Sequence, residues 1–532
     1  MNLIRATGSI GVLTLVSRVL GFVRDMLMAR FVGATFASDA FLVAFRLPNM
    51  FRALFAEGAF TAAFIPMFNR KVAEEGGDLK PGLKFAEDAL SVLLPVLVVF
   101  TIIMLAAATP VVWILSGGFN GVSAAQFAYA VELSRITFPY LLFISLVSLF
   151  GGILNSIGKF WVAAAAPILL NLTLIVALLG FNGPTEADTA RVQAIAVTVS
   201  GVLQLIWLMA ACRRSGVSLR VRRPRLSPDV KRLMKLILPA AAGAGAVQIN
   251  LVISTALAAG LLAEGSVSYI YYADRLNQLP LGLIGIGLGT VLLPTISRQL
   301  GGGREAEAME TQNRGMELAL FLSLPATAAL MVAAVPIIRT LLEHGAFTAH
   351  DTVQSAYALS AFSLGLPAYI LVKVLTPGFY ARSDTRTPVR FAIIAIGVNL
   401  VLNLALILPL KHVGPALATA ISAWVNVALL YRALHGRGHF VPDARLRRRA
   451  ARLLLASIIM GAALYGIDLL IAPMTGGALW TRIGGLAILV GGGTAIYAAA
   501  TFLTGAFTLA DLKMLTRRRT VDTAAAADKG KP

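Results

Sequence analysis

The chain has 532 residues, of which 58% are hydrophobic and 14% are charged, and its formal net charge is +20. Soluble domains carry about 25% charged residues, so this composition excludes an ordinary soluble protein. The basic excess lies in short loops, where it orients membrane helices, and no nucleic-acid partner is expected. Long apolar runs, rather than short alternating ones, predict an all-α polytopic membrane protein.

About fourteen transmembrane spans are predicted, each near the roughly 20 residues that a helix needs to cross a bilayer. Their ranges are 8–33, 37–69, 86–115, 129–155, 160–180, 191–211, 236–261, 266–298, 315–342, 352–378, 389–409, 414–434, 453–472 and 480–505. The second span is too long for a straight crossing. It contains Pro48, Gly58 and Pro66, so we expect a bent or broken helix.

Basic residues fill every second loop. They cluster at 70–84, 213–235 and 437–452, whereas 116–128 contains no Lys or Arg. The positive-inside rule therefore predicts that both termini are cytoplasmic, which an even number of spans also requires.

An internal repeat relates the two halves of the chain. Arg46-Leu47 recurs 229 residues later as Arg275-Leu276, and Pro139 recurs 228 residues later as Pro367. Two parallel six-helix lobes around a central cavity are therefore expected. The predicted order is an N-lobe at 1–212, a basic cytoplasmic loop at 213–235, a C-lobe at 236–436, a second basic cytoplasmic loop at 437–452, two further spans at 453–505, and a cytoplasmic tail at 506–532 that is predicted to be disordered.

Charged side chains interrupt the apolar spans. The first two spans contain Arg18, Arg24, Asp25, Asp39, Arg46, Asn49, Arg52 and Glu57, and the eighth contains Asp274 and Arg275. An arginine at the centre of a membrane helix costs roughly 2.5–3.5 kcal/mol, so these residues should face a water-filled cavity or a partner. Because arginine stays charged and binds phosphate oxygens bidentately, the pattern predicts a transporter of an acidic substrate.

A purely structural interpretation stays open for several of these residues. Arg24–Asp25 and Arg52–Glu57 could be ion pairs that lock helices together, and Arg275 could be a helix-end arginine at the headgroups. We find no metal-ligand spacing, Walker motif or catalytic triad in the sequence, so no enzyme, metal or cofactor is expected. The energy for transport is expected from an ion gradient, the membrane potential or substrate flux.

Six short motifs occur in order along the chain. They are Ser17 to Asp25 (SRVLGFVRD), Ser38 to Phe41 (SDAF), Arg46 to Asn49 (RLPN), Phe55 to Phe60 (FAEGAF), Tyr271 to Leu276 (YYADRL) and Pro377 to Arg382 (PGFYAR). These motifs resemble the MurJ (MviN) family, bacterial lipid II flippases of the multidrug/oligosaccharidyl-lipid/polysaccharide (MOP) exporter superfamily. The resemblance covers essentially the whole chain.

The resemblance implies a fold and a function. It implies fourteen helices, two six-helix lobes, a cationic central cavity, and a groove on the last two helices that holds a polyprenyl tail. The implied function is to flip lipid II (undecaprenyl-pyrophosphoryl-MurNAc-pentapeptide-GlcNAc) from the cytoplasmic to the outer leaflet by alternating access, for peptidoglycan synthesis. The implied location is the bacterial inner membrane. The implied partners are lipid II, the phospholipid bilayer and other cell-wall synthesis proteins.

The family's functional positions match this chain residue by residue. The matching residues are Arg18, Arg24, Asp25, Asp39, Arg52, Glu57 and Arg275, with Arg46 where the family often has lysine and Gln278 where some members have an acid. The predicted substrate site consists of Arg18, Arg24, Arg46, Asn49, Arg52 and Arg275. The predicted gating or charge-partner residues are Asp25, Asp39, Glu57 and Asp274.

Three alternative functions make different demands on the sequence. A flippase for another polyprenyl-linked oligosaccharide stays open, because the pyrophosphate is shared. A MATE-like antiporter for cationic drugs would need acids, rather than arginines, to dominate the cavity. A non-transporting scaffold would give no reason for intramembrane arginines.

Overall fold

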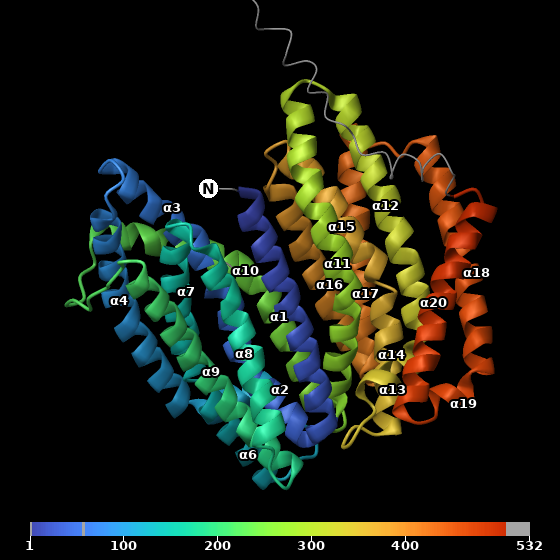
Figure 1. Cartoon of the computed structure of the whole chain (residues 1–532), viewed down its shortest axis with the longest axis horizontal. Helices are drawn as coiled ribbons and strands as arrows, with labels where there is room; N and C mark the ends of the chain where they lie inside the picture. The colour runs from blue at the N-terminus through green and yellow to red at the C-terminus, as the bar shows by residue number, and fades with distance from the viewer. Residues whose placement is uncertain (1–2, 56–58, 507–532) are drawn as a thin grey trace, which may run out of the picture. The chain divides into compact units, whose positions relative to one another are not determined.

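The computed structural model describes residues 3–55 and 59–506, and within these ranges the chain is helical, with turns and loops but no strand (Figure 1). The helices are α1 (Leu3–Val32), α2 (Phe36–Phe55), α3 (Ala59–Glu74), α4 (Leu79–Ala106), α5 (Ala108–Ser116), α6 (Ala124–Thr137), α7 (Tyr140–Ser156), α8 (Phe160–Gly180), α9 (Glu186–Arg214), α10 (Pro228–Leu261), α11 (Ser266–Gly301), α12 (Glu305–Val332), α13 (Ala334–Leu342), α14 (Ala349–Ser363), α15 (Leu366–Tyr380), α16 (Arg386–Leu410), α17 (Val413–Gly436), α18 (Ala444–Leu470), α19 (Ala472–Thr475) and α20 (Leu479–Leu503). The all-α class is confirmed.

Eleven stretches of the described residues are long and apolar enough to cross a membrane. They coincide with the predicted third to sixth and eighth to fourteenth spans, so a multi-pass membrane protein is confirmed. The other three predicted spans coincide with α1, with α2 and α3, and with α10. The count of fourteen crossings stays a prediction. Glu57 and Gly58 lie outside the described residues, as do positions 507–532 of the predicted tail, so the expected break in the second span is not tested.

The order of helices repeats along the chain. α4 and α5 meet at Ala107, and α12 and α13 meet 226 residues later at Ala333. Similarly, Pro139 directly precedes α7, and Pro367 lies in the first turn of α15. Proline fits these positions because the first turn of a helix needs no backbone N–H donor from it. The repeat found in the sequence is therefore visible in the helix boundaries.

The described chain forms two compact units. Of the described residues, unit 1 contains those up to Gln278, Ile338–Phe362 and Val389–Asn426, and unit 2 contains Leu279–Ile337, Ser363–Pro388 and those from Val427 onward. In unit 1, α1 packs on α8, α9 packs on α7 and α8, and α3 packs on α4, α7 and α10. In unit 2, α12 packs on α15 and α18, and α18 packs on α20, as Figure 1 shows. The predicted lobe limits stay predictions.

Among the helices that begin earlier than the predicted spans are α10 and α18. Ser227 and Asp443 cap α10 and α18, their side chains accepting hydrogen bonds from Val230 N and Leu446 N. Capping by Ser or Asp satisfies a backbone donor at the helix start, so part of each predicted basic loop is helical. The remaining loop at 215–227 lies against α4, where Arg220 N donates to Glu87 over 3.0 Å.

Candidate functional site

Arg24, Asp25 and Arg275 form a cluster between α1 and α11 within unit 1. The Asp25 carboxylate accepts from Arg24 Nη2 over 2.6 Å and from Arg275 Nε over 2.8 Å. Arg24 and Asp25 are 7% and 3% exposed, whereas the Arg275 side chain is 35% exposed. Two guanidinium groups thus share one carboxylate, so the cluster has a net charge of +1, and Arg275 is its most accessible member.

Two residues that the sequence analysis did not select hold this cluster in place. The Tyr271 hydroxyl donates to Asp25 over 3.0 Å and accepts from Arg24 over 3.2 Å, while Arg275 lies 5.5 Å from the centre of the Tyr271 ring. Asn171 of α8 accepts from Arg24 over 3.1 Å and donates to Ser17 O over 2.9 Å. Asn171 and Thr173 are the polar residues of the otherwise apolar fifth span, and an amide side chain in such a span is the sequence feature that could have identified Asn171.

Arg46 of α2 interacts with α10. Its Nη2 donates to Leu251 O over 3.1 Å and to the Thr255 hydroxyl over 2.5 Å. Its Nε is buried without a hydrogen-bond partner among the described residues, and no described carboxylate forms an ion pair with it. Asp274 accepts from Gln278 over 2.5 Å. Arg46 therefore makes no direct ion pair within the described part of the chain, although the Asp274 carboxylate lies close enough to interact with its charge.

The remaining predicted cationic residues are arranged differently. Arg52 donates to Asn49 over 3.1 Å within α2, so both belong to one local contact. Arg18 is exposed on α1 and makes no hydrogen bond or ion pair with the residues that the structure describes. It does not join the Arg24–Asp25–Arg275 cluster, although it shares a helix with two of its members.

Asp39 binds a helix N-terminus rather than an arginine in this structure. Its carboxylate accepts from Gly265 N over 2.8 Å, Ser268 N over 2.9 Å and the Ser268 hydroxyl over 2.6 Å, at the start of α11. Glu264 makes the reciprocal contact, accepting from Phe36 N at the start of α2 over 2.7 Å. Carboxylates are favourable at helix N-termini because free N–H groups and the helix dipole both attract negative charge. We call these contacts the reciprocal caps.

A backbone contact joins the last turn of α1 to the turn that precedes α14. Ala346 N donates to Arg30 O over 2.9 Å. Gly33 has a φ of +68°, and a Cβ there would lie 2.5 Å from Ala346 O. Glycine is therefore required both by its left-handed backbone and by the close approach of the two turns.

Two asparagines of α16 join it to neighbouring helices. Asn403 of α16 donates to Ser254 of α10 over 2.8 Å, and Asn399 donates to Thr419 of α17 over 3.2 Å. Within the described residues, no group of three or more His, Cys, Asp or Glu side chains could hold a metal ion. The arrangement offers arginines for binding an anion.

Comparisons with known proteins identify similar chains. The family model described as "Lipid II flippase MurJ" matches residues 28–481. A protein of Rhizobium tropici named "Probable lipid II flippase MurJ" is 43% identical over 510 residues, covering 95% of each chain. A solved structure titled "Lipid II flippase MurJ, inward closed conformation" has a TM-score of 0.76 at 24% identity, covering 93% of this chain and 98% of that one.

A second solved structure is more distant. Its title is "Inward-facing conformation of a multidrug resistance MATE family transporter of the MOP superfamily", and it has a TM-score of 0.63 at 17% identity. The match covers 79% of this chain and 94% of that one. At these identities the two solved structures support the fold alone.

Proposed function

Because the chain belongs to the MurJ family of lipid II flippases, we propose that it moves lipid II from the cytoplasmic to the outer leaflet by alternating access, for cell-wall synthesis. The observation that carries this proposal is the buried cluster in which Arg24 and Arg275 share Asp25. A cluster with surplus positive charge inside a membrane suits a pyrophosphate and disfavours a cationic drug.

The pyrophosphate would bind first at Arg275, the most exposed arginine of the cluster. Its oxygens would replace Asp25 as the partner of Arg275, and Asp25 would keep its bond to Arg24. Arg46, which has no described carboxylate partner, would add charge from α2. Substrate binding thus changes the partners of Asp25, and such a difference in contacts is needed for a substrate to shift a conformational equilibrium.

The predicted roles of the other site residues are part of the same proposal. Arg18, Asn49 and Arg52 would line the route of the headgroup, and Asp39, Glu57 and Asp274 would act in gating. The reciprocal caps at Asp39 and Glu264 would have to separate for the cavity to open at that end. No cofactor is assigned, and the energy would come from an ion gradient, the membrane potential or substrate flux.

We further propose fourteen crossings in two six-helix lobes, with both termini in the cytoplasm. The basic residues at 213–235 and 437–452 support that orientation by the positive-inside rule. The polyprenyl tail would remain in lipid along α18 and α20. Exposed apolar side chains on these helices support this placement, among them Leu455, Ile458 and Val490.

The decisive experiment is depletion of the protein in cells, followed by addition of a lipid II-cleaving enzyme outside the membrane. We expect lipid II to accumulate and become inaccessible to that enzyme. If lipid II stays accessible while another polyprenyl-linked sugar accumulates inside, the substrate is the other oligosaccharide. If neither accumulates, the transport function is wrong.

The site is tested by complementation of the depleted cells. Arg275→Ala and Arg18→Ala should insert normally but fail to support growth, because each removes a charge that the pyrophosphate needs. Arg386→Ala is the matched control, because Arg386 is exposed at the start of α16. Full growth with either of the first two variants, at wild-type protein levels, would refute the role of that arginine.

A further inference from the structure

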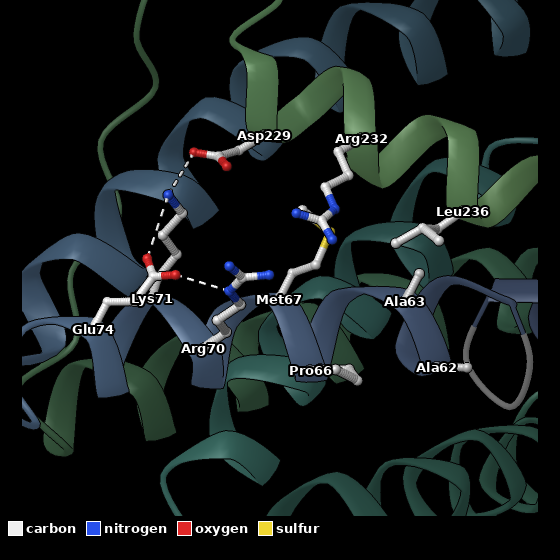
Figure 2. A pocket seen from close by; sticks show the side chains of 10 residues that line it. All are labelled: Ala62, Ala63, Pro66, Met67, Arg70, Lys71, Glu74, Asp229, Arg232 and Leu236. Carbon is white, nitrogen blue, oxygen red and sulfur yellow. Dashed lines mark hydrogen bonds and ion pairs between the residues drawn. The ribbon is translucent and has the colours of Figure 1, made fainter.

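A pocket of about 420 Å³ lies between α3 and the start of α10, apart from the arginine cluster (Figure 2). This volume is within the range of small-ligand sites, roughly 300–1,000 Å³. Its lining residues are Ala62, Ala63, Pro66, Met67, Arg70, Lys71, Glu74, Asp229, Arg232 and Leu236. None of them belongs to the proposed lipid II site.

The lining is divided into an apolar end and a charged end. The first part of α3 and Leu236 of α10 provide the apolar side chains, and the later turns of α3 and the first turns of α10 provide the charges. A site with this division fits a ligand that has a charged group next to an apolar one. A free inorganic anion would contact the charged end of the pocket and leave the apolar end empty.

The acids of the pocket already have partners. Glu74 accepts from Arg70 Nε over 2.8 Å and lies 3.9 Å from Lys71 Nζ, and Asp229 lies 3.0 Å from Lys71 Nζ. Arg232 makes no ion pair or hydrogen bond with the described residues. Three cations and two carboxylates leave a net charge of +1.

Two guanidinium groups face the same space from opposite walls. Figure 2 shows the Arg70 guanidinium pointing from α3 and the Arg232 guanidinium pointing from α10 into the pocket. Like charges that face each other repel, and an anion between them would convert this repulsion into two attractive contacts. A phosphate group suits this position because its oxygens can accept from both guanidiniums at once.

The start of α10, which lines the pocket, directly follows the basic loop at 215–227. We assign this end of α10 to the cytoplasmic surface. The inner leaflet carries anionic lipids, and basic residues close to it attract their headgroups. The single negative charge of a phosphodiester also matches the surplus of +1.

From these observations we propose that the pocket between α3 and α10 binds one anionic phospholipid. Its phosphodiester lies between Arg70 and Arg232, and its glycerol and the upper part of one acyl chain contact Met67, Pro66 and Leu236. The lipid holds α3 and α10 together, so its binding stabilises the contact between these two helices.

The test measures lipid binding to the delipidated full chain in detergent. Phosphatidylglycerol, phosphatidylcholine and inorganic phosphate are added separately, and the melting temperature and the bound lipid are measured. Phosphatidylglycerol should raise the melting temperature, and the other two should not. In the double variant Arg70→Gln/Arg232→Gln its affinity should fall about thirtyfold, because two basic residues near the headgroup are lost.

The matched control is Arg213→Gln/Arg223→Gln, which removes two exposed arginines of the same basic region outside the pocket and should bind like the wild type. Ala62→Phe should also weaken binding, because it fills the apolar end without changing the charge.

The proposal is overturned if the double variant binds phosphatidylglycerol normally, if phosphatidylcholine binds equally well, or if inorganic phosphate gives the same shift. Because the assay involves no transport, its failure leaves the proposed flippase function intact.

Discussion

Asp25 is the residue on which the arginine cluster depends, since among the described residues it is the carboxylate that bonds both Arg24 and Arg275. Removing one partner of a buried ion pair costs about 3–5 kcal/mol, because the remaining charge is left uncompensated. In this cluster the loss of Asp25 would leave two neighbouring guanidiniums to repel each other.

Asp25→Asn should therefore lower the melting temperature of the purified protein strongly. The control is Asp188→Asn, because Asp188 pairs with Arg191 at a site where its side chain is 38% exposed. Exposed pairs contribute about 0–1 kcal/mol, so that variant should melt close to the wild type. Equal melting temperatures for both variants would contradict the central role of Asp25. Differential scanning fluorimetry in one detergent provides the comparison.

Tyr271 has a positioning role, which can be tested by removing its hydroxyl group alone. Tyr271→Phe keeps the ring beside Arg275 but removes the bonds to Arg24 and Asp25. We expect a stability loss of about 2 kcal/mol, because two hydrogen bonds of about 1 kcal/mol each are lost, together with slower lipid II transport in proteoliposomes. Tyr357→Phe is the control, because Tyr357 is 57% exposed. If Tyr271→Phe transports lipid II at the wild-type rate, the hydroxyl group has no positioning role and Tyr271 contributes only through the packing of its ring.

At the scale of elements, ion pairs at helix ends join helices that are distant in the sequence. Glu317 of α12 is bound by Arg314, Arg445 and Arg449, and the last two lie in the first turns of α18. Asp443, which caps α18, also bonds Arg314. Basic residues of the predicted loop at 437–452 thus join α18 to α12.

A second contact of this kind predicts a pH dependence. Between α15 and α16, Asp384 accepts from Arg437 over 2.7 Å and from the Thr387 hydroxyl and backbone N–H. These hydrogen bonds, that from Arg437 foremost, hold the pKa of Asp384 below its usual value. A lowered pKa in the folded state means that the stabilisation is complete above the unfolded pKa, about 3.9, and is lost as the pH falls through the folded value.

Asp384→Asn should therefore melt below the wild type at pH 7, and the difference should shrink as the pH falls below about 4. Arg437→Gln should show the same convergence, because it removes the main cause of the pKa shift. Melting curves from pH 7 to pH 3 test this directly. A difference that stays constant over this range would show that the charge of Asp384 is not responsible.

At the scale of the molecule, the proposed alternating-access cycle would require the contacts at one end of unit 1 to separate. There the reciprocal caps join α2 to α11, and Ala346 N bonds Arg30 O. Asp39 and Ser268 are buried in these contacts, at 3% and 0% exposed, whereas Glu264 is exposed. Removing both carboxylates with Asp39→Ala/Glu264→Ala should favour the open state, because two helix N-termini lose their partners.

A cysteine at position 346 would report this opening. It should react with a membrane-impermeant maleimide faster in the Asp39→Ala/Glu264→Ala protein than in the otherwise wild-type protein. Cys212 is buried and is replaced by serine in both, so that the signal comes from one thiol. Equal labelling rates would contradict the role of the caps in closure.

The sequence by itself determined the class of the protein and most of its spans. Apolar runs of membrane length report burial in lipid, which is a local property of composition, and the positions of the repeated prolines reappear as helix boundaries. The sequence also identified Arg24, Asp25 and Arg275 as candidates, because charges inside apolar runs are costly wherever they lie.

Only the tertiary structure decided how these charges are paired. Residues 24 and 275 are 251 positions apart, and no periodicity specifies that α1 and α11 bring them to one carboxylate with Tyr271 and Asn171. Arg18 and Asp25 are seven residues apart, so an α-helix places them on one face, yet Arg18 is exposed and Asp25 is buried, because the neighbouring helices determine which part of a helix surface is covered. Likewise, Asp39 binds the start of α11. A helix N-terminus attracts a carboxylate as an arginine does. However, this attraction comes from the backbone, so no charged residue in the sequence predicts it.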